Sequence, residues 1–393
     1  MIKLLLLILG FAVLIFGEVL KVYFIMPFPG SQEDEVIQWA YLIHTQIGWI
    51  RLVGALLLLY PLYGYLRQSP VWARATIAVV LGFYAVVFYM FNYRFLADKI
   101  FLQPENVGFL DASHSKVSGK QLALGITVGG ESKAYPIEII GYHHQVLDVV
   151  GGQQVMVTYC TVCRTGRVYS PTVDGQPETF RLVGMDHYNA MFEDATTGSW
   201  WRQVSGEAIA GPRKGTALAE IESAQMTINE WINLHPNTLV LQPDEKFAKA
   251  YDELKNYDEG TRKGRLERKD SVSWQDKSWV VGVQIGMNAR AYDWIQLQQA
   301  RVINDSLNQT PIVVTLSADS LSHFVFNRVL APDTLQLMYK DGKIVDEGGS
   351  VWSPAGRCTD GPRAGKTLTP IASYQEYWHS WRTFHPQSTR YIP

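Results

Sequence analysis

The chain has 393 residues and a formal net charge of −2, from 35 lysines and arginines against 37 aspartates and glutamates. Its length exceeds one ordinary domain, and its near-neutral charge without a basic patch argues against a nucleic-acid partner. Apolar residues are concentrated in the first hundred positions. This distribution predicts a membrane-embedded region followed by a soluble part.

Three long apolar segments fill the N-terminal region, from about Leu4 to Met26, from about Tyr41 to Leu66 and from about Val71 to Leu96. Each can cross a hydrocarbon layer of about 30 Å, which takes roughly 20 helical residues. A cleaved signal peptide explains the first segment poorly, because it lacks a clear cleavage site and two more segments follow. We therefore predict that residues 1–100 form a membrane anchor of three transmembrane helices.

The charges of the connecting loops predict the orientation of this anchor. Lys3 precedes the first span and the second loop is basic at residues 67–74, whereas residues 33–35 are acidic. Because basic loops stay on the cytoplasmic side, residues from about 100 onward are expected outside the cytoplasm. The basic residues within 94–99 argue the other way. The predicted location is the cell membrane, with the soluble C-terminal part outside the cytoplasm.

Three polar residues within the apolar segments are candidates for function, as intramembrane ionisable groups generally are. Glu18 and Lys21 lie one helical turn apart, so we expect them to pair with each other. His44 is a candidate cofactor ligand, although a haem held on both axial faces needs two histidines. The structural interpretation is favoured for all three.

The soluble part contains two similar stretches of sequence. The stretch from Ala134 aligns without gaps with the one from Ala291, and the stretch from Ser205 later aligns with the one from Ala355. We interpret this as an internal duplication, with a repeating unit much longer than that of a solenoid. The predicted regions are a first half at 116–243, a charged linker or lobe at 244–276, and a second, degenerate half at 277–393.

Short β-branched or aromatic runs bounded by glycine or proline dominate the first half. They predict strands at 122–128, 155–159, 167–169 and 179–183, with a tight turn at Gly151-Gly152. The predicted fold class is therefore α+β, a β-rich duplicated domain preceded by a transmembrane helical region.

Two short helices are also predicted in the first half. One covers residues 136–143, and the other begins at a capping box, Thr227 with Glu230, and ends near His235. In the second half, Ser373 and Glu376 are expected to form the corresponding capping box.

Features present in both halves are interpreted as architectural. They are the glycine-proline-arginine loops around Arg213 and Arg363, and the histidines His235 and His385, which we expect at helix ends near the negative end of the dipole. Trp200 and Trp201 are expected to be core or interface aromatics.

Two cysteines, Cys160 and Cys163, lie at the end of an apolar run in the first half, and His144 lies before this run in the sequence. The aligned positions of the second half hold Ser317, Ser320 and Arg301. Three metal-ligand side chains are thus absent together while the apolar framework remains. This pattern indicates a site in the first half, but it names no reaction and leaves open whether the protein is an enzyme.

Several common uses of a C-x-x-C pair do not fit. Haem attachment needs a histidine after the second cysteine, where Arg164 stands. Thioredoxin chemistry needs the pair to open a helix, and the following residues, with Gly166 and Pro171, are poor helix formers. A closed structural zinc site needs four ligands. An open site therefore remains, in which two thiolates and one imidazole suit copper or zinc.

His144 is the preferred third ligand beside Cys160 and Cys163, and His143 and His187 are alternatives. Arg164 and Arg167 are expected to favour the thiolate form by proximity. The competing interpretation is a structural disulfide, which an oxidising compartment would allow. The remaining cysteine, Cys358, is expected to be buried.

Three runs of the soluble part carry a further pattern: VTYCTVCRTGRVYSP, HYNAMFEDATTGSWWRQVSGEAIAGP and EWINLHPNTLVL. They resemble domain-of-unknown-function family 3179, an uncharacterised extracytoplasmic C-x-x-C domain. The matching positions are Asp148, Cys160, Cys163, Tyr188, Asn189, Asp194, Thr197, Ser199, Trp201, His235, Pro236 and Thr238, together with the stretch from Lys277 to Val283. His144 occupies the place of a common histidine, whereas Thr161 replaces the usual proline.

The resemblance covers the chain from about residue 120 to the C-terminus and does not include the anchor. It implies an uncharacterised protein outside the cytoplasm and supplies no reaction. Our first hypothesis is a membrane-anchored protein with a metal-binding or thiol-redox site formed by Cys160, Cys163 and His144. The alternative is a non-catalytic binding or assembly module in which the cysteine pair is a structural disulfide. Any protein partner is unidentified.

Overall fold

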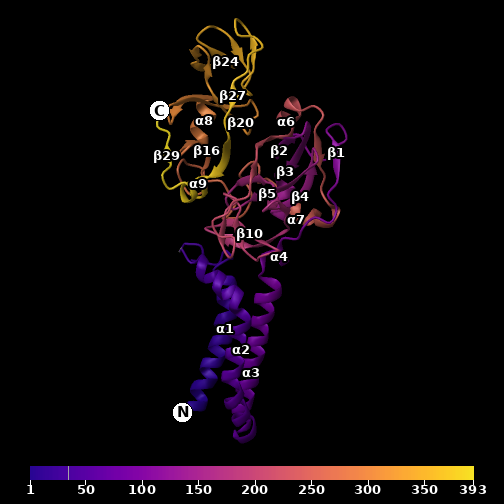
Figure 1. Cartoon of the computed structure of the whole chain (residues 1–393), viewed down its shortest axis with the longest axis vertical. Helices are drawn as coiled ribbons and strands as arrows, with labels where there is room; N and C mark the ends of the chain where they lie inside the picture. Colours follow the sequence, from indigo (N-terminus) through magenta and orange to yellow (C-terminus); the bar gives the residue numbers. More distant parts are fainter. Residues whose placement is uncertain (34) are drawn as a thin grey trace. The chain divides into compact units, whose positions relative to one another are not determined.

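The computed structural model describes residues 1–33 and 35–393 (Figure 1). The chain divides into two compact units: unit 1 comprises residues 1–102 and 175–217, and unit 2 comprises residues 103–174 and 218–393. The predicted fold class is confirmed, because N-terminal helices precede a β-rich region of many short strands. The boundaries of the four predicted regions stay a prediction.

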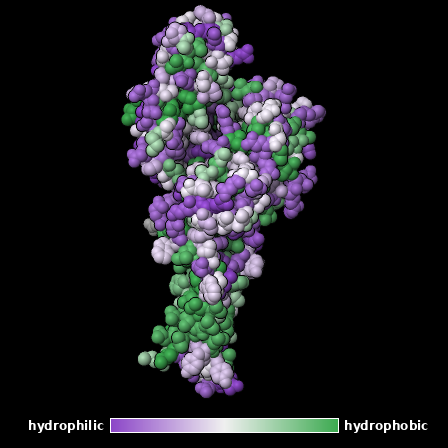
Figure 2. Space-filling view, in the orientation of Figure 1, coloured by the Kyte–Doolittle hydropathy of each residue, from purple (hydrophilic) through white to green (hydrophobic). Residues whose placement is uncertain are grey.

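The helices of unit 1 match the predicted spans. They are α1 (Ile2–Tyr23), α2 (Ile37–Gln68) and α3 (Val71–Tyr89), which continues into a π-helical turn over Met90–Arg94. Within the described residues, these three are long and apolar enough to cross a membrane, and apolar side chains cover their surface (Figure 2). A Cβ at Gly10 would lie 2.7 Å from Leu58, so this glycine lets α1 and α2 pack closely.

Glu18 pairs with Lys21 at 3.4 Å, as predicted, but it also belongs to a wider network. Arg51 Nε donates to Glu18 Oε1 at 2.6 Å, and Asn92 Nδ2 donates to Glu18 Oε2 at 2.8 Å. The carboxylate is therefore held by residues from α1, α2 and the end of α3. Such full pairing explains how a charged side chain is accommodated in an apolar helix bundle.

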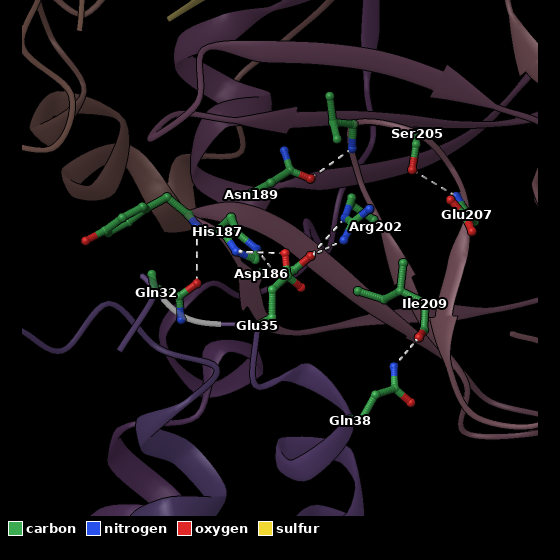
Figure 3. Close-up of polar contacts among 12 residues, drawn as sticks. Gln32, Glu35, Gln38, Asp186, His187, Asn189, Arg202, Ser205, Glu207 and Ile209 are labelled. Carbon is green, nitrogen blue, oxygen red and sulfur yellow. Dashed lines mark hydrogen bonds and ion pairs between the residues drawn. The ribbon is translucent and has the colours of Figure 1, made fainter. Parts of the chain in front are cut away.

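Unit 1 also contains a four-stranded sheet that packs on the helices. Its order is β12-β11-β10-β9, from β9 (Phe180–Asp186), β10 (Asn189–Asp194), β11 (Trp200–Arg202) and β12 (Ala208–Ala210). Gln38 Nε2, at the start of α2, donates to Ile209 O at 2.7 Å, and Gln32 accepts from Tyr188 N (Figure 3). His44 lies 3.5 Å from Glu193 and edge-on to Trp200, so its role here is packing against the sheet.

The first half contributes two sheets to unit 2. One has the order β1-β15-β3-β2-β14, from β1 (Phe109–Asp111), β2 (Leu122–Val128), β3 (Glu131–Pro136), β14 (Ser223–Thr227) and β15 (Leu239–Leu241). The other has the order β13-β6-β5-β4, from β4 (Gln145–Val150), β5 (Gln153–Cys160), β6 (Thr165–Tyr169) and β13 (Glu220–Ile221). The helices α5 (Ile137–His143) and α6 (Ile228–Leu234) pack on these strands.

The second half repeats these elements in the same order. One sheet has the order β28-β16-β17-β29, from β16 (Trp279–Ile285), β17 (Asn288–Asp293), β28 (Ser373–Tyr377) and β29 (Thr389–Arg390). Another has the order β18-β19-β20-β27, from β18 (Val302–Leu307), β19 (Thr310–Leu316), β20 (His323–Asn327) and β27 (Thr369–Pro370). Its helices are α8 (Trp294–Ala300) and α9 (Trp378–Phe384).

A third sheet of the second half has the order β23-β24-β25-β26, which is the order of the sheet in unit 1. Its strands are β23 (Leu337–Lys340), β24 (Lys343–Asp346), β25 (Val351–Trp352) and β26 (Cys358–Asp360). Short elements complete the chain: α4 (Ala97–Ile100), α7 (Ala248–Glu253), a 3-10 turn at Glu245–Phe247, and the strands β7 (Thr172–Val173), β8 (Gln176–Pro177), β21 (Val329–Leu330) and β22 (Asp333–Thr334).

Within unit 2, corresponding residues of the two halves meet each other. Gln225 Nε2 donates to Gln375 Oε1 at 2.7 Å, and these residues occupy the same place on β14 and β28. The loop after β5 contacts the start of α9, where Tyr377 N donates to Cys163 O at 3.0 Å. The loop after β19 likewise contacts the start of α6. The halves therefore pack about an approximate two-fold axis, with each inserting one loop against the other.

Several local predictions are confirmed. Gly151 and Gly152 form the turn between β4 and β5 with φ of 54° and 81°, and a helix covers 137–143. Thr227 caps α6 by accepting from Glu230 N at 3.2 Å.

The capping box predicted at Ser373 and Glu376 is wrong. Both residues lie in β28, and Tyr377 precedes α9 without a side-chain cap. Glu376 instead accepts from Arg167 and Ser380, so a buried ion pair uses the carboxylate that the pattern assigned to a cap.

The segment at 244–276, predicted to be a charged linker or lobe, contains three buried aromatic residues. Phe247, Tyr251 and Tyr257 lie in the apolar core formed with β2–β6 and α5. The many charged residues around them in the sequence gave no indication of this burial. Tyr251 and several residues that follow it, up to Glu259, also contribute to the acidic cleft described below.

Each half contains a strand glycine that makes room for a helix tryptophan. A Cβ at Gly125 would lie 2.4 Å from the ring of Trp231, and one at Gly282 would lie 2.2 Å from Trp381. We therefore expect Gly125→Ala and Gly282→Ala each to lower the free energy of unfolding by about 1–3 kcal/mol, the usual range for overpacking. Chemical denaturation of the detergent-solubilised protein measures this change.

Gly108→Ala is the matched control, because a Cβ at Gly108 meets no atom within 4 Å. Equal denaturation midpoints for Gly125→Ala and Gly108→Ala would show that the tryptophan does not constrain the strand.

Candidate functional site

The two cysteines lie in the loop that joins β5 to β6. Cys160 ends β5 and pairs with Thr165 across the hairpin. Arg164 has a φ of 58°, in the left-handed region that reverses the chain before β6. Cys160 and Cys163 are thiols, 1% and 0% exposed, and they share a hydrogen bond. The hairpin therefore holds two neighbouring sulfurs away from solvent.

Side chains of the second half surround this loop. Lys277, just before β16, donates from Nζ to Val162 O at 2.6 Å. His379 Nε2, in the first turn of α9, lies 3.0 Å from the same oxygen and 3.1 Å from Lys277 Nζ. The Ser380 hydroxyl, which donates to Glu376 Oε2 at 2.8 Å, lowers the pKa of the Cys163 thiol. The site is thus built from both halves, although the sequence pattern placed it in the first half alone.

Burial controls the charge of these groups. It raises the pKa of the Cys163 thiol well above its ordinary value, and the neighbouring thiol of Cys160 adds to this effect. The Lys277 ammonium acts in the opposite direction on Cys163, while burial lowers the pKa of Lys277 itself. Burial also lowers the pKa of His379 to about 3. At neutral pH the site therefore holds a protonated Cys163 thiol beside a neutral imidazole.

The two arginines of the loop have other roles than the predicted activation of thiols. The Arg164 guanidinium lies 3.7 Å from the ring centre of Trp279 and donates from Nε to Gln375 at 2.8 Å. Arg167 forms a buried ion pair of 2.6 Å with Glu376. Both side chains join the halves of unit 2. The cation that acts on the Cys163 thiol is Lys277, which the thiol pattern did not identify.

The predicted third ligand, His144, lies at the end of α5 with a φ of 61°. It is buried, and burial lowers its pKa to about 4, so its imidazole is neutral at physiological pH. Among residues 1–33 and 35–393, no group of three or more His, Cys, Asp or Glu side chains is arranged to hold a metal ion. Ligation by Cys160, Cys163 and His144 therefore stays a prediction.

The two alternative histidines have other partners. His143 Nε2 lies 2.7 Å from Tyr251 Oη inside an aromatic cluster. His187 belongs to unit 1, where Nδ1 lies 2.8 Å from Asp186 Oδ1 and where Arg202 holds the second oxygen of that carboxylate (Figure 3). The hydrogen bond that His187 makes to the Asp186 carboxylate raises the pKa of His187. Both histidines thus stabilise local structure.

Cys358 is buried, as predicted. Its thiol donates to Asp360 O at 3.3 Å within the core of the second half, which includes Trp352 and Leu368. It makes no disulfide.

The aspartates of the family-like pattern are structural acceptors. Asp194 accepts from Ser199 N at 3.1 Å and from Trp201 Nε1 at 2.8 Å. In the second half, Asp346 accepts from Ser350 N and from Trp352 Nε1 in the same way. This turn recurs in the half that lacks the C-x-x-C pair, which supports an architectural role.

The other shared features follow the same logic. Asp148 accepts from Lys133 and Tyr135, and the corresponding Asp305 accepts from Arg290 and Tyr292. Arg213 N and Arg363 N each donate to a serine hydroxyl of the preceding turn. Trp200 and Trp201 are core residues, as expected.

His235 and His385 lie at the helix ends as predicted, but the dipole is not the reason. Burial lowers the pKa of both histidines, so neither needs to be charged. Instead, His235 stacks on Trp231 with ring centres 4.0 Å apart, and His385 stacks on Trp381 at 3.8 Å.

Comparison with known proteins identifies one similarity. Residues 104–388 match the model of a protein family described as Protein of unknown function (DUF3179). No curated protein and no solved structure matches the chain.

The charge on Lys277 gives a direct test of the thiol environment. Removing the ammonium in Lys277→Met should make the thiolate of Cys163 harder to form, because Lys277 opposes the effect of burial on the thiol. We expect alkylation of Cys163 by iodoacetamide at pH 8 to slow about tenfold. Peptide mass spectrometry at timed quenching points measures the rate.

Lys120→Met provides the control, because Lys120 occupies the position in the first half that corresponds to Lys277. If both variants react at the wild-type rate, Lys277 does not act on the thiols.

Proposed function

The chain belongs to the family of proteins of unknown function DUF3179, and we propose that it is a membrane-anchored, extracytoplasmic protein whose Cys160–Cys163 pair is a dithiol–disulfide redox centre. The three apolar helices of unit 1 supply the anchor. The acidic loop at residues 33–35 and the basic residues before α1 and between α2 and α3 support the proposal that unit 2 lies outside the cytoplasm.

One observation carries the proposal: residues that distinguish the halves meet at one place. On the loop of the first half stand Cys160 and Cys163, whereas the corresponding positions of the second half hold two serines. His379 and Ser380, which face that loop, replace Asn229 and Glu230 at the corresponding positions of the second half. If the loop had only a structural role, there would be no reason for the loop and the residues that contact it both to differ from their counterparts in the other half.

The arrangement suits thiol–disulfide exchange. A thiolate of the pair attacks a disulfide of a partner and releases one partner thiol, and the second cysteine then displaces the other. The two S–H protons and two electrons of the pair end on the two partner thiols, and one S–S bond forms between Cys160 and Cys163. The Lys277 ammonium stabilises the thiolate stage. Because both sulfurs are buried, loop 160–165 must move during exchange.

A soft metal ion is the second candidate function. In the second half, Arg301 Nη1 donates to Ser320 Oγ at 2.8 Å, and its other nitrogen Nη2 donates to Ser317 O. These residues correspond to His144, Cys163 and Cys160, which supports proximity of the imidazole to the sulfurs. Copper(I), or zinc with an open position, suits two thiolates and one imidazole. Side chains would have to rearrange, because they form no metal-holding group as placed.

The redox proposal is tested in the Cys358→Ser variant, which leaves only the two thiols of the pair. The full-length protein is equilibrated in glutathione and dithiothreitol buffers, alkylated and analysed by mass spectrometry. We expect interconversion of dithiol and disulfide with a midpoint above about −300 mV, the level below which structural disulfides lie. Cys160→Ser should abolish the transition.

A disulfide that persists below about −300 mV would instead support the structural alternative, a non-catalytic assembly module. Stoichiometric copper or zinc, lost in Cys160→Ser and Cys163→Ser and reduced in His144→Gln, would replace the redox proposal by the metal proposal.

A further inference from the structure

A second site lies in unit 2 at the position that corresponds to the thiol site. It is a cleft of about 830 Å³ where the start of α6 meets the loop of the second half that ends at Leu321. Lys120, Asn229 and Glu230 line it, and they correspond to Lys277, His379 and Ser380. The approximate two-fold packing thus generates two corresponding sites, the buried thiol site and this open cleft without thiols.

The cleft is strongly acidic. Six carboxylates line it, from Glu138, Glu230, Asp252, Asp258, Glu259 and Asp319, against the ammonium groups of Lys120 and Lys255. Asp319 is fully used by the loop, because it accepts from the hydroxyls of Thr227 and Ser322 and from two backbone amides. The turn that holds Asp319 does not account for the presence of the other five carboxylates in the cleft.

Asp258 is the residue that points to a ligand. Its side chain is 5% exposed and lines the cleft. Oδ2 accepts from Leu122 N at 2.8 Å, but Oδ1 is buried without a hydrogen-bond partner. A buried carboxylate oxygen without a donor is costly, and a bound cationic group would supply that donor.

Glu138 is the second carboxyl group whose ionised form is disfavoured in the cleft. Gln121 Nε2 donates to its Oε2 at 2.5 Å. Burial, and next the charge of Asp258, raise the pKa of Glu138 to about 7. Asp252 and Glu259 also raise this pKa, whereas Lys255 lowers it. Burial likewise raises the pKa of Asp258 to about 6. Close carboxylates that resist ionisation gain most from a positive charge placed between them.

We propose that this cleft binds a small organic cation, a primary diamine or an amino-guanidine, with Asp258 and Glu138 as the main acceptors. The cleft volume lies in the range of small-molecule sites. An organic cation fits better than a bare metal ion, because the described residues offer no group of three metal-holding ligands there. The ammonium donors of a diamine can reach separate carboxylates, as a single ion cannot.

The probe is 1,4-diaminobutane, titrated into the full-length protein in detergent micelles by isothermal calorimetry. We expect submillimolar binding, weakened at least tenfold by Asp258→Asn and by Glu138→Gln. The neutral 1,4-butanediol, of the same length, should not bind. The exposed carboxylate variant Glu347→Gln should bind as the wild type, and unfolding midpoints check that each variant is folded.

Proton release gives an independent readout. Because the pKa values of Glu138 and Asp258 are raised, both hold a fraction of a proton near pH 6.5, and a bound dication favours their ionised forms. Binding should therefore release protons, so the observed heat should differ between phosphate and Tris buffers.

Absence of diamine binding at 10 mM, equal binding of the diol, or wild-type affinity in both cleft variants would each overturn the proposal. Binding of Ca²⁺ alone, without the diamine, would overturn it too. None of these outcomes involves the cysteines, so the proposal stands or fails separately from the redox function.

Discussion

Reciprocal insertion of loops between the two halves is the constraint on which unit 2 depends. Each hairpin loop lies against the first turn of the other half's helix, and the buried Arg167–Glu376 pair fixes one of these contacts. Because a buried charge without its partner is severely destabilising, neither half can keep this arrangement alone. The loops are therefore positioned by tertiary contacts, and the turn geometry alone does not determine where the thiols point.

The same constraint creates two corresponding sites with different chemistry. A two-fold arrangement of two similar halves places equivalent positions in equivalent surroundings, so a substitution in either half changes only one of the sites. One site holds the buried Cys160 and Cys163 beside Lys277, and the other is a cleft lined by Asp258, Glu138 and Lys120. A pair of halves can thus retain one backbone framework while its two sites diverge.

Much of the framework was predictable from the sequence. Apolar length predicted the three helices, and β-branched runs bounded by glycine predicted strands such as Leu122–Val128. The Thr227 cap and the Gly151-Gly152 turn were predictable because they depend on neighbouring residues only. The cap assigned to Glu376 failed for the opposite reason, because its partner Arg167 is distant in the chain.

The composition of the site shows the same limit. The cysteine pair was visible in the sequence, but Lys277, His379 and Ser380 were not identified as its neighbours. Aligning Asn229 and Glu230 with His379 and Ser380 shows that these positions also differ between the halves. This difference identifies neighbours of the cysteine pair only once it is known that the cysteine loop packs against α9. No sequence pattern indicated the acidic cleft, because its carboxylates come from four separate stretches of chain.

The division into units has a consequence for proteolytic cleavage of the chain. Unit 1 is assembled from residues 1–102 and 175–217, so the polypeptide passes between the units three times. A protease that cuts once after the last helix would leave the fragment attached through the sheet of β9–β12, which packs on α2. Release of unit 2 from the helices would therefore require several scissions or disruption of that sheet.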